Sequence, residues 1–399
     1  MRDAVIVEAV RTPVGKGKPA GALAGVHAVD LFAHSIRAVV ERSGVDPDVI
    51  DDVIGGCVDQ VAEQAMNTTR YAALAAGLPE HVPATTIDRQ CGSSQQAVHF
   101  AAQGVISGAY DVVVAGGVES MSRVPMWSNV PEGADPFGPA LADRYPDGLV
   151  PQGVSAELIA ARWDLGRADL DRFALTSHER AHAAATAGLF EREIAPIKAP
   201  GADGSVVEVA ADEGIRPGGD LEALARLRPA FEDPAFAARF PEIGWHITAA
   251  NSSQISDGSA ALLITTSERA AELGLRPRAR LHSFAVVGDD PLMMLTAVIP
   301  ATAKVLGRAG LTIDDIDVFE VNEAFSSVVL AWLAETGADP ARVNVHGGAL
   351  AIGHPLGASG ARIMTTMLGA MEARGARYGL QTMCEAGGLA NATIVERVP

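Results

Sequence analysis

Apolar and polar positions alternate with two different periods in two parts of the chain. Short apolar runs, typical of buried strands, are followed by stretches in which apolar residues recur with a helical period. In the first part we expect strands at residues 4–10, 52–56 and 111–115 and helices at 28–43 and 94–107. In the last third we expect strands at residues 279–287, 317–321 and 378–384 and helices at 302–309, 324–335 and 360–374. This alternation predicts an α/β fold that layers helices on sheets.

The two parts follow one plan. Gly44 precedes Ile50 and a strand. Gly310 precedes Ile316 and a strand, and the spacing from Gly to Ile is the same. Residues 115–117, Ala-Gly-Gly, end a late strand of the first part, and residues 386–388, also Ala-Gly-Gly, follow the late strand of the second. We therefore expect two duplicated halves.

The segment between the halves has a different composition and hydrophobic pattern. Pro-rich stretches at residues 130–153, 194–200 and 229–241 surround helical patterns at 154–163 and 169–187, and the chain returns to a core-like run at 247–265. Such a segment is typical of an inserted lid or loop domain. The predicted division is an N-terminal half at residues 1–118 with 247–270, an inserted loop domain at 119–246, and a C-terminal half at 271–399.

Size and charge narrow the class of protein. A chain of 399 residues is too long for one ordinary core, and 48% hydrophobic with 20% charged residues indicates a globular protein. A net charge of −18 repels polyanions, which excludes nucleic acid and an anionic membrane surface as partners. A phosphate-bearing small molecule could still bind a local basic pocket, because fields are screened within about 10 Å.

The cysteines and the N-terminus indicate a compartment. The three cysteines are odd in number and sparse, which argues against a disulfide framework and for a reducing environment. No Cys or His spacing suits zinc, so we expect no metal. The first residues lack the pattern of a signal peptide, and no apolar run approaches the roughly 20 residues of a membrane span. We expect a soluble cytoplasmic protein.

Two cysteines lie in Gly-containing turns. Cys91 opens a helix within Asp-Arg-Gln-Cys-Gly-Ser-Ser, where the helix dipole and free N–H groups favour a thiolate, and Gly92 permits close approach of a substrate backbone. Cys384 ends an apolar strand before small residues, whose N–H groups could form an oxyanion hole. For each taken alone, a buried inert thiol is the more common alternative.

Two further polar residues lie at comparable junctions. His354 stands between Gly353 and Pro355 just before a helix, which suits a histidine that faces a cavity; a turn or capping histidine is the alternative. Asn322 follows a strand and precedes a helix, where helix capping is the simpler alternative. Together the four residues supply what nucleophilic acyl transfer needs: a thiol nucleophile, a base, oxyanion donors and a second acid for a carbon atom.

The sequence resembles the thiolase family over nearly its whole length. The matching segments are VRTP at residues 10–13, 67–70, AGLP at 76–79, CGS at 91–93, GGVESMS at 116–122, LRP at 227–229, 251–258, NEAF at 322–325, GHP at 353–355, and Cys384 with the glycines after it. The resemblance implies two βαβαβαββ halves that form a five-layered αβαβα core. It also implies that the inserted loop domain covers a coenzyme A site.

The resemblance also assigns roles to residues. Cys91 would accept the acyl group, and His354 would activate it and hydrogen-bond the thioester oxygen. Asn322 would hold a water in that same oxyanion hole. Cys384 would exchange a proton with the acetyl carbon or the coenzyme A thiol. The backbone N–H groups of Cys91 and Ala386 would form a second oxyanion hole.

For coenzyme A, Arg216 resembles the family's nucleotide-contacting arginine and Ser253 the serine beside the pantetheine. An unpaired surface Arg and an ordinary turn Ser are the alternatives. The implied substrates are coenzyme A thioesters, with no permanently bound cofactor, and the implied assembly is a homodimer or homotetramer.

Two departures bear on the substrate. Residues 385–386 are Glu-Ala where the family is usually Gly-rich, which resembles a subset of degradative thiolases, and an alanine still donates its N–H if its backbone angles suit. Residues 151–152 are Pro-Gln where biosynthetic acetoacetyl-CoA thiolases carry His-Met. We therefore expect reversible thiolytic cleavage of a longer or bulkier 3-ketoacyl-CoA, from fatty-acid or sterol side-chain breakdown.

Three alternatives stay open. A biosynthetic acetoacetyl-CoA thiolase would run the reaction as a condensation. A ketoacyl synthase shares the fold and the nucleophile, but such enzymes present His or Asn partners where this chain has Cys384. A non-catalytic acyl-CoA-binding paralogue would not need all four polar residues.

Overall fold

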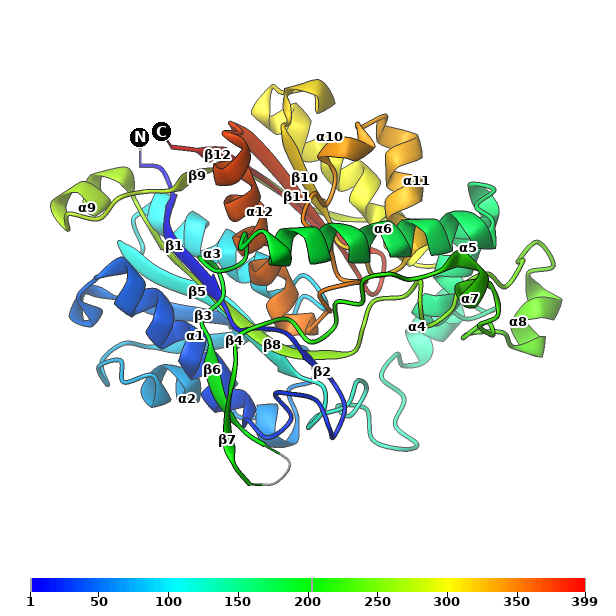
Figure 1. Cartoon of the computed structure of the whole chain (residues 1–399), viewed down its shortest axis with the longest axis horizontal. Coiled ribbons are helices and arrows are strands. Elements are labelled where there is room, and N and C mark those ends of the chain that lie inside the picture. The colour runs from blue at the N-terminus through cyan, green and yellow to red at the C-terminus, as the bar shows by residue number, and fades with distance from the viewer. Residues whose placement is uncertain (1, 202–203, 399) are drawn as a thin grey trace.

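The computed structural model describes residues 2–201 and 204–398, and its main feature is one mixed sheet that runs through the whole molecule (Figure 1). The first portion of the sheet holds, in spatial order, β1 (Val5–Arg11), β8 (Ser256–Thr265), β5 (Val112–Ser120), β3 (Asp52–Gly56) and β4 (Ala84–Ile87). The second portion holds β9 (Ala279–Gly288), β12 (Leu389–Arg397), β11 (Tyr378–Glu385) and β10 (Val318–Val321). The portions join where β1 pairs with β9, and the short β2 (Gly15–Lys16) pairs with β8.

Both portions have the same strand order and directions. The first two pairings are antiparallel and the next is parallel, from β1 through β8 and β5 to β3 and from β9 through β12 and β11 to β10. The registers also agree: Gly55 pairs with Gly116, and Val321 pairs with Thr382, each residue 266 positions later. A single parallel bridge at Val343 stands where β4 stands in the first portion. The predicted duplication is confirmed.

Equivalent residues close equivalent turns in the two halves. The Asp51 carboxylate accepts two backbone N–H groups at the start of β5, and Asp317 does the same at the start of β11. Gly44 and Gly310 end equivalent helices in the left-handed region, with φ of 72° and 67°. A left-handed terminal residue satisfies the last carbonyls of a helix, and glycine adopts that conformation without strain.

One detail of the predicted duplication is wrong. Residues 115–117 do not end a strand, because β5 continues through them to Ser120. A Cβ on Gly116 would fall 2.1 Å from the carbonyl oxygen of Ala260, and one on Gly117 would fall 2.3 Å from that of Gly357. These glycines therefore allow close backbone packing inside the fold. Their equivalents are residues 381–383 within β11, not the Ala-Gly-Gly that follows it.

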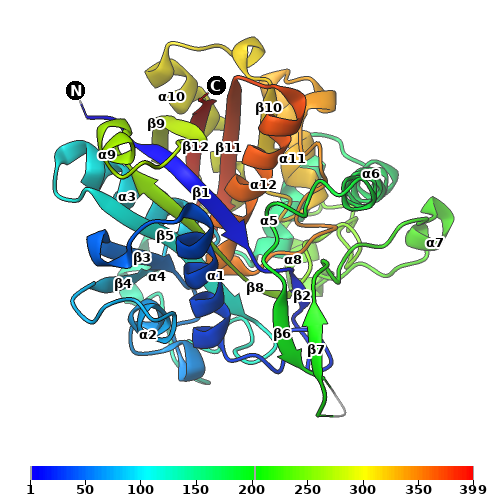
Figure 2. The same cartoon turned by 60° about the vertical axis from the view of Figure 1, so that its left-hand side comes forward.

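The helices form three layers around the two portions of the sheet (Figures 1 and 2). The central layer is α3 (Ser93–Ser107) and α12 (Ser359–Arg374), which pack on each other and share one apolar core with strands of both halves. α1 (Ala28–Ser43) and α2 (Thr68–Ala75) cover the outer face of the first portion. α10 (Val298–Ala309) and α11 (Ser326–Thr336) cover that of the second. This is the expected five-layered core.

The outer helix α1 and the central helix α3 differ as their positions require. α1 buries one stripe that includes Leu31, Phe32, Ile36 and Val39, while its other face is solvated. α3 is buried on most of its surface and is rich in Ser and Ala, so that neighbouring backbones can approach closely. The central layer is therefore the one that a substrate-binding site can enter from both halves.

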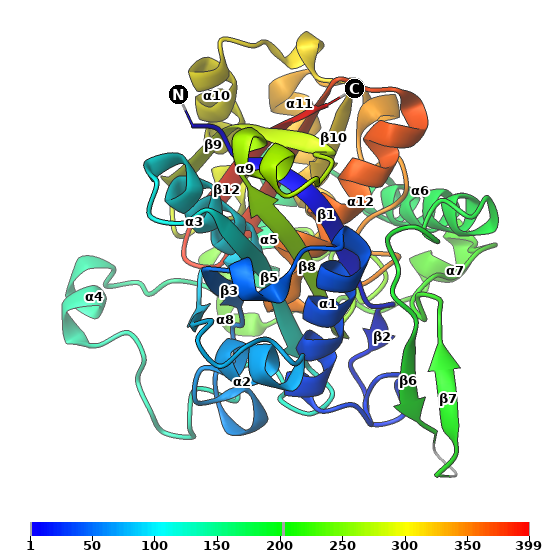
Figure 3. The ribbon, with the colours of Figure 1, turned by 90° about the vertical axis from the view of Figure 1, so that its left-hand side faces the viewer.

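The segment between β5 and β8 carries the long helix α6, which lies across one side of the core (Figure 1). Its elements are α4 (Pro139–Arg144), α5 (Gln152–Arg162), α6 (Arg167–Thr186), the hairpin β6 (Ile197–Pro200) with β7 (Val206–Val209), α7 (Leu221–Ala225) and α8 (Pro234–Arg239). α5 and α6 pack on α11, while the segment with α4 projects from the body (Figure 3). The predicted boundary at 118/119 falls inside β5, and the division into three parts stays a prediction.

Several elements, most of them short, were not expected from the periodicity. They are α2, β2, β4, the β6–β7 hairpin, α4, α7, α8, α9 (Ser267–Glu272), β12, and 3₁₀ turns at Pro47–Val49, Ala62–Gln64, Met294–Ala297, Ile313–Asp315, Pro340–Arg342 and Leu356–Ala358. Most are too short to show a period. In the part of the chain that the structure describes, no helix has the length and apolar character needed to cross a membrane.

Candidate active site

Cys91 lies in the turn that leads into the central helix α3, as predicted. The Asp88 carboxylate accepts the N–H of Gln90 at 2.6 Å and holds Gln90 at a φ of 49°, which turns the chain just before the cysteine. The Ser93 hydroxyl accepts the N–H of Arg89 at 2.9 Å and closes the same turn. The Cys91 side chain is buried in a small apolar cluster made up of Val58, Met121, Leu356, Ile363 and Met383.

Cys384 and Asn322 come together from neighbouring parallel strands. Cys384 lies near the end of β11 and Asn322 directly follows β10, and Asn322 Nδ2 lies 3.7 Å from Cys384 Sγ as a donor. Asn322 does not cap the next helix, because α11 begins at Ser326 with Phe325 at its N-cap. Asn322 Oδ1 is buried and has no partner among the described residues, so it is free to bind a ligand or water.

The hydrogen bonds of His354 define its tautomer. Ser359 Oγ donates its one proton to the Pro355 carbonyl at 2.8 Å, so His354 Nδ1, 2.6 Å from Ser359 Oγ, must be the donor to that oxygen. His354 Nε2 then carries a lone pair, and no other described residue partners it. Burial lowers the pKa of His354 to about 3, with Arg362 contributing, so the imidazole is neutral and Nε2 can act as a base.

The thiols are protonated, contrary to the expectation for Cys91. Burial raises the pKa of Cys91 well above its usual value, and the nearby Cys384 adds to the effect. Burial likewise raises the pKa of Cys384 to about 12, although the hydrogen bond from Asn322 opposes the shift. Desolvation thus outweighs the helix N-terminus at Cys91. Its thiolate has to be formed by a base during the reaction, and that is the role that His354 can fill.

Two buried glutamates that the sequence did not single out build the frame of the site. Glu119, on β5, accepts the N–H of Gly357 at 2.8 Å and so ties the first half to the loop that follows His354. Glu323 accepts the hydroxyl of Ser177 at 2.6 Å and so ties the strand end beside Asn322 to α6. Both lie in segments that resemble the family, GGVES and NEAF, which was the available signal.

The backbone of Ala386 suits the role expected of it. Ala386 is not among the non-glycine residues with positive φ, whereas Gly387 and Gly388 have φ of 83° and 79°. The turn therefore takes its left-handed residues from the two glycines, and Ala386 carries its Cβ without strain. The N–H groups of Cys91 and Ala386 take no part in the turn, loop and cap hydrogen bonds of the described residues.

The expected coenzyme A contacts lie on segments that border the site. The N–H of Ser253 donates to the Ala324 carbonyl at 2.9 Å, two residues beyond Asn322. Gln254 donates to the carbonyl of Gly214 at 3.1 Å and itself accepts the N–H of His354. Arg216 follows two residues after Gly214, and its side chain is exposed. Through Gln254, Ser253 and the Arg216 loop are therefore both linked to the segment that holds His354.

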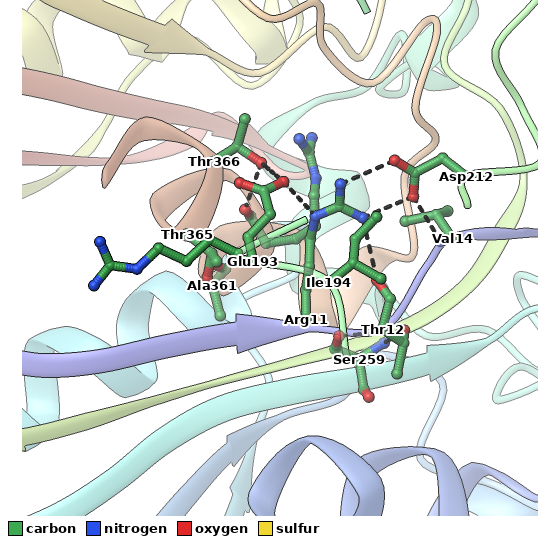
Figure 4. Close-up of polar contacts among 12 residues, drawn as sticks. Arg11, Thr12, Val14, Glu193, Ile194, Asp212, Ser259, Ala361, Thr365 and Thr366 are labelled. Atoms are coloured by element: carbon green, nitrogen blue, oxygen red, sulfur yellow. Dashed lines mark hydrogen bonds and ion pairs between the residues drawn. The ribbon is translucent and has the colours of Figure 1, made fainter. Parts of the chain in front are cut away.

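A buried ion-pair cluster anchors the Arg216 loop to the core (Figure 4). Arg11, on β1, binds both carboxylate oxygens of Asp212 at 2.7 and 2.9 Å, and its Nε binds Glu193 at 2.7 Å. Asp212 also accepts the N–H of Val14, and Glu193 accepts the hydroxyl of Thr366 on α12. Both carboxylates belong to the segment between β5 and β8, so the cluster ties that segment to both halves.

Among residues 2–201 and 204–398, no group of three or more His, Cys, Asp or Glu side chains is arranged to hold a metal ion.

The chain was compared with known proteins. Residues 4–268 match the family model of the thiolase N-terminal domain, and residues 275–397 match that of the thiolase C-terminal domain. The steroid 3-ketoacyl-CoA thiolase FadA6 of Mycobacterium tuberculosis is 50% identical, over 100% of this chain and 95% of that protein. The 3-ketoacyl-CoA thiolases of Serratia proteamaculans and Pseudoalteromonas translucida are 45% and 44% identical over 100% of both chains. With both domains matched and full-length relatives at this identity, the chain belongs to the thiolase family.

Proposed function

We propose that this thiolase cleaves 3-ketoacyl-CoA with coenzyme A, giving acetyl-CoA and a shortened acyl-CoA, by way of an acyl group on Cys91. One observation carries the proposal: the Cys91 and Cys384 thiols of the two halves interact, Asn322 donates to Cys384, and Leu356 of the His354 loop packs with Cys91, while His354 Nε2 and Asn322 Oδ1 are buried and lack partners among the described residues. Buried polar atoms are normally satisfied, so unpartnered ones beside two thiols mark a place built for a ligand.

The first half-reaction follows from the protonation states. His354 Nε2 takes the Cys91 proton, and the sulfur attacks the 3-keto carbon. The C2–C3 bond breaks, the acyl group stays on Cys91, and the electron pair passes to the acetyl-CoA enolate. Cys384 then delivers its proton to the enolate carbon, and a thiol with a pKa of about 12 stays protonated until that step.

The second half-reaction reverses these roles. The Cys384 thiolate takes the proton of incoming coenzyme A, whose sulfur attacks the acyl-Cys91 carbonyl. The shortened acyl-CoA leaves, and His354 returns its proton to Cys91. The N–H groups of Cys91 and Ala386 would stabilise the oxyanion of this step, and Asn322 with a water and His354 that of the first. We assign the coenzyme A contacts to Arg216 and Ser253, because both lie beside the segment that holds His354.

The test uses the three thiols as matched variants. In Cys91→Ala the mass increase of the protein after incubation with acetyl-CoA should disappear, while Cys57→Ala should keep it. Cys384→Ser should still be acylated slowly but should lose carbon–carbon cleavage. A persistent acetyl adduct in Cys91→Ala would assign the nucleophile elsewhere, and equal loss of both steps in Cys384→Ser would refute its role as the acid.

For the acyl group, we propose a longer or bulkier substrate than acetoacetyl-CoA, from fatty-acid or sterol side-chain breakdown. Pro151-Gln152 replaces the pair typical of acetoacetyl-CoA thiolases, and an apolar cluster surrounds Cys91. A relative named for steroid 3-ketoacyl-CoA supports the bulkier choice. A panel of 3-ketoacyl-CoA thioesters of rising length and bulk tests this, and the highest kcat/KM on acetoacetyl-CoA would favour the biosynthetic alternative.

We also propose that the chain forms a homodimer or homotetramer in the cytoplasm. Exposed apolar side chains lie on or just before α2 and on the projecting segment before α4, namely Met66, Tyr71, Leu74, Met126, Trp127 and Phe137. Several exposed apolar side chains on neighbouring segments of a globular protein favour an interface there. Sedimentation velocity should give a species of two or four chains, and the double variant Met66→Ser, Trp127→Ser should shift it toward the monomer.

A further inference from the structure

Two glutamates occupy equivalent places in the two halves. Glu119 on β5 and Glu385 at the end of β11 lie 266 positions apart, the same spacing as the paired strand residues and as Ser93 and Ser359, which begin α3 and α12. The side chain of each glutamate lies near the start of the other half's central helix. Glu119 contacts Gly357, just before α12, and Glu385 contacts Gly92, just before α3. The two carboxyl groups are therefore structural counterparts.

Their surroundings differ completely. Glu119 accepts N–H groups from Val58, Asp59, Gly357 and Gln64 at 2.7–3.1 Å. Neither carboxyl oxygen of Glu385 has a hydrogen-bond partner among the described residues, although the side chain is 0% exposed. One member of the pair is thus saturated, and the other is left unpartnered.

The unpartnered carboxyl lies beside the nucleophile. A Cβ on Gly92 would fall 1.8 Å from Glu385 Oε1, so this glycine makes room for the carboxyl and not, as we expected, for a substrate backbone. Met383, two residues earlier on the same face of β11, packs against Cys91. Glu385 therefore approaches the start of α3 on the side where Cys91 lies.

Such a carboxyl group has to be neutral. A buried carboxylate with few donors is costly, and burial raises the pKa of Glu385 well above its ordinary value, with the Arg89 charge and the Asn391 N–H opposing the shift and Asp88 reinforcing it. A neutral carboxyl carries an O–H that needs an acceptor, and a buried donor left without one is destabilising. An acceptor appears beside it when Cys91 loses its proton.

We propose that Glu385 donates a hydrogen bond to the Cys91 thiolate once His354 has taken the thiol proton, and so stabilises the nucleophile of this reaction. The inference rests on Cys91 being the acylated residue. Besides His354, the titratable groups that act on Cys91 are Cys384, Glu385 and Glu119, and a negative charge on any of these three raises the pKa of Cys91, so Glu385 can stabilise the thiolate only as a neutral donor. No other reactant is required, because the Glu385 proton stays on its own carboxyl group.

The test is the pH dependence of Cys91 alkylation by iodoacetamide, followed on the Cys91 peptide by mass spectrometry. Glu385→Gln keeps a neutral donor and should leave the midpoint unchanged. Glu385→Leu and Glu385→Met remove the donor at similar size and should raise the midpoint by about one pH unit, which slows alkylation about tenfold below the midpoint. Acylation by acetyl-CoA should slow in parallel, with KM unchanged.

Two other outcomes of the alkylation experiment would refute the proposal. A lower midpoint in Glu385→Gln would mean that Glu385 is ionised in the native protein and would refute the proposal even if the apolar variants fail to fold. An unchanged midpoint in folded Glu385→Leu and Glu385→Met would also refute it. Alkylation needs no substrate, so an unacylated wild-type protein would refute the proposed function separately. Unchanged protection of the Cys57 peptide checks that each variant is folded.

Discussion

The two halves of this thiolase share their strand order and register but carry different side chains at equivalent positions. Asn322, Cys384 and His354 lie 266 positions after Gly56, Val118 and Asp88, and the counterpart of Cys91 is Gly357. At one of the two equivalent places the chain has two thiols, a neutral histidine and unpartnered polar atoms. At the other it has Gly56, Val118, Asp88 and Gly357, and the Glu119 carboxylate beside them has its hydrogen bonds satisfied.

This difference shows how a duplicated frame yields a single site. The frame depends on backbone register and on turns such as those closed by Asp51 and Asp317, which both halves keep. The site depends on which half leaves its polar groups unsatisfied. Glu119 uses its hydrogen bonds to hold the halves together, whereas Glu385 keeps a free carboxyl group beside Cys91.

The largest expected difference between the halves is catalytic. His354→Asn should lower kcat for thiolysis by about 10²–10⁴-fold, because it removes the base that we propose for Cys91. Asp88→Asn, at the equivalent position, should lower it by less than about tenfold, because an asparagine oxygen still accepts the N–H of Gln90. Initial rates on a 3-ketoacyl-CoA compare the two variants, and losses of similar size would contradict the asymmetry.

The second difference is in stability. Glu119→Ala should lower the free energy of unfolding by at least about 3 kcal/mol, because several buried donors lose their acceptor at once. Glu385→Ala should cost clearly less, because that carboxyl has no partner to lose. Urea unfolding measures both variants, and equal losses would mean that Glu385 is as structural as Glu119.

The third prediction concerns the pH dependence of stability that arises from one buried histidine of each half, His99 and His354. Burial lowers the pKa of both His99 and His354 to about 3, while an unfolded histidine titrates near 6.5. Between these values the unfolded chain binds the proton and the folded one does not. Each histidine should therefore cost up to about 1.4 kcal/mol of stability for every pH unit below 6.5.

The matched variants are His99→Gln and His354→Gln. Each should flatten the decline of unfolding free energy between pH 6.5 and 4.5 by a similar amount, measured by urea unfolding at several pH values. His99 Nε2 also contacts the Thr393 hydroxyl at 2.7 Å, so its variant is compared with wild type by slope and not by absolute stability. Unchanged slopes would show that these side chains are accessible to protons in the folded protein.

The smallest expected effect is one that the halves should share. Gly44→Ala and Gly310→Ala each place a Cβ on a left-handed residue, with nothing within 4 Å of it. Strain alone should cost about 1 kcal/mol in each variant. Thermal unfolding should show equal decreases, and a clear inequality would mean that the two helix ends are not equivalent.

The parts that the sequence predicted best are those governed by local rules. α1 and β3 were predicted with their observed bounds, because an apolar stripe, a terminal glycine and a short buried run suffice to define them. The strand β12, in contrast, was missed, since its residues gain their buried faces only by pairing with β9 and β11. The end of β5 was misplaced because glycines that serve close packing look like a turn.

The sequence by itself determined the family, the duplicated plan and the identity of the four polar residues, because each depends on residue types in order along the chain. Only the tertiary structure decided their states. It protonated both thiols by burial, gave His354 its free nitrogen through Ser359, and left Glu385 without a partner while it saturated Glu119. Desolvation and hydrogen-bond partners come from segments hundreds of residues apart, and no local pattern encodes them.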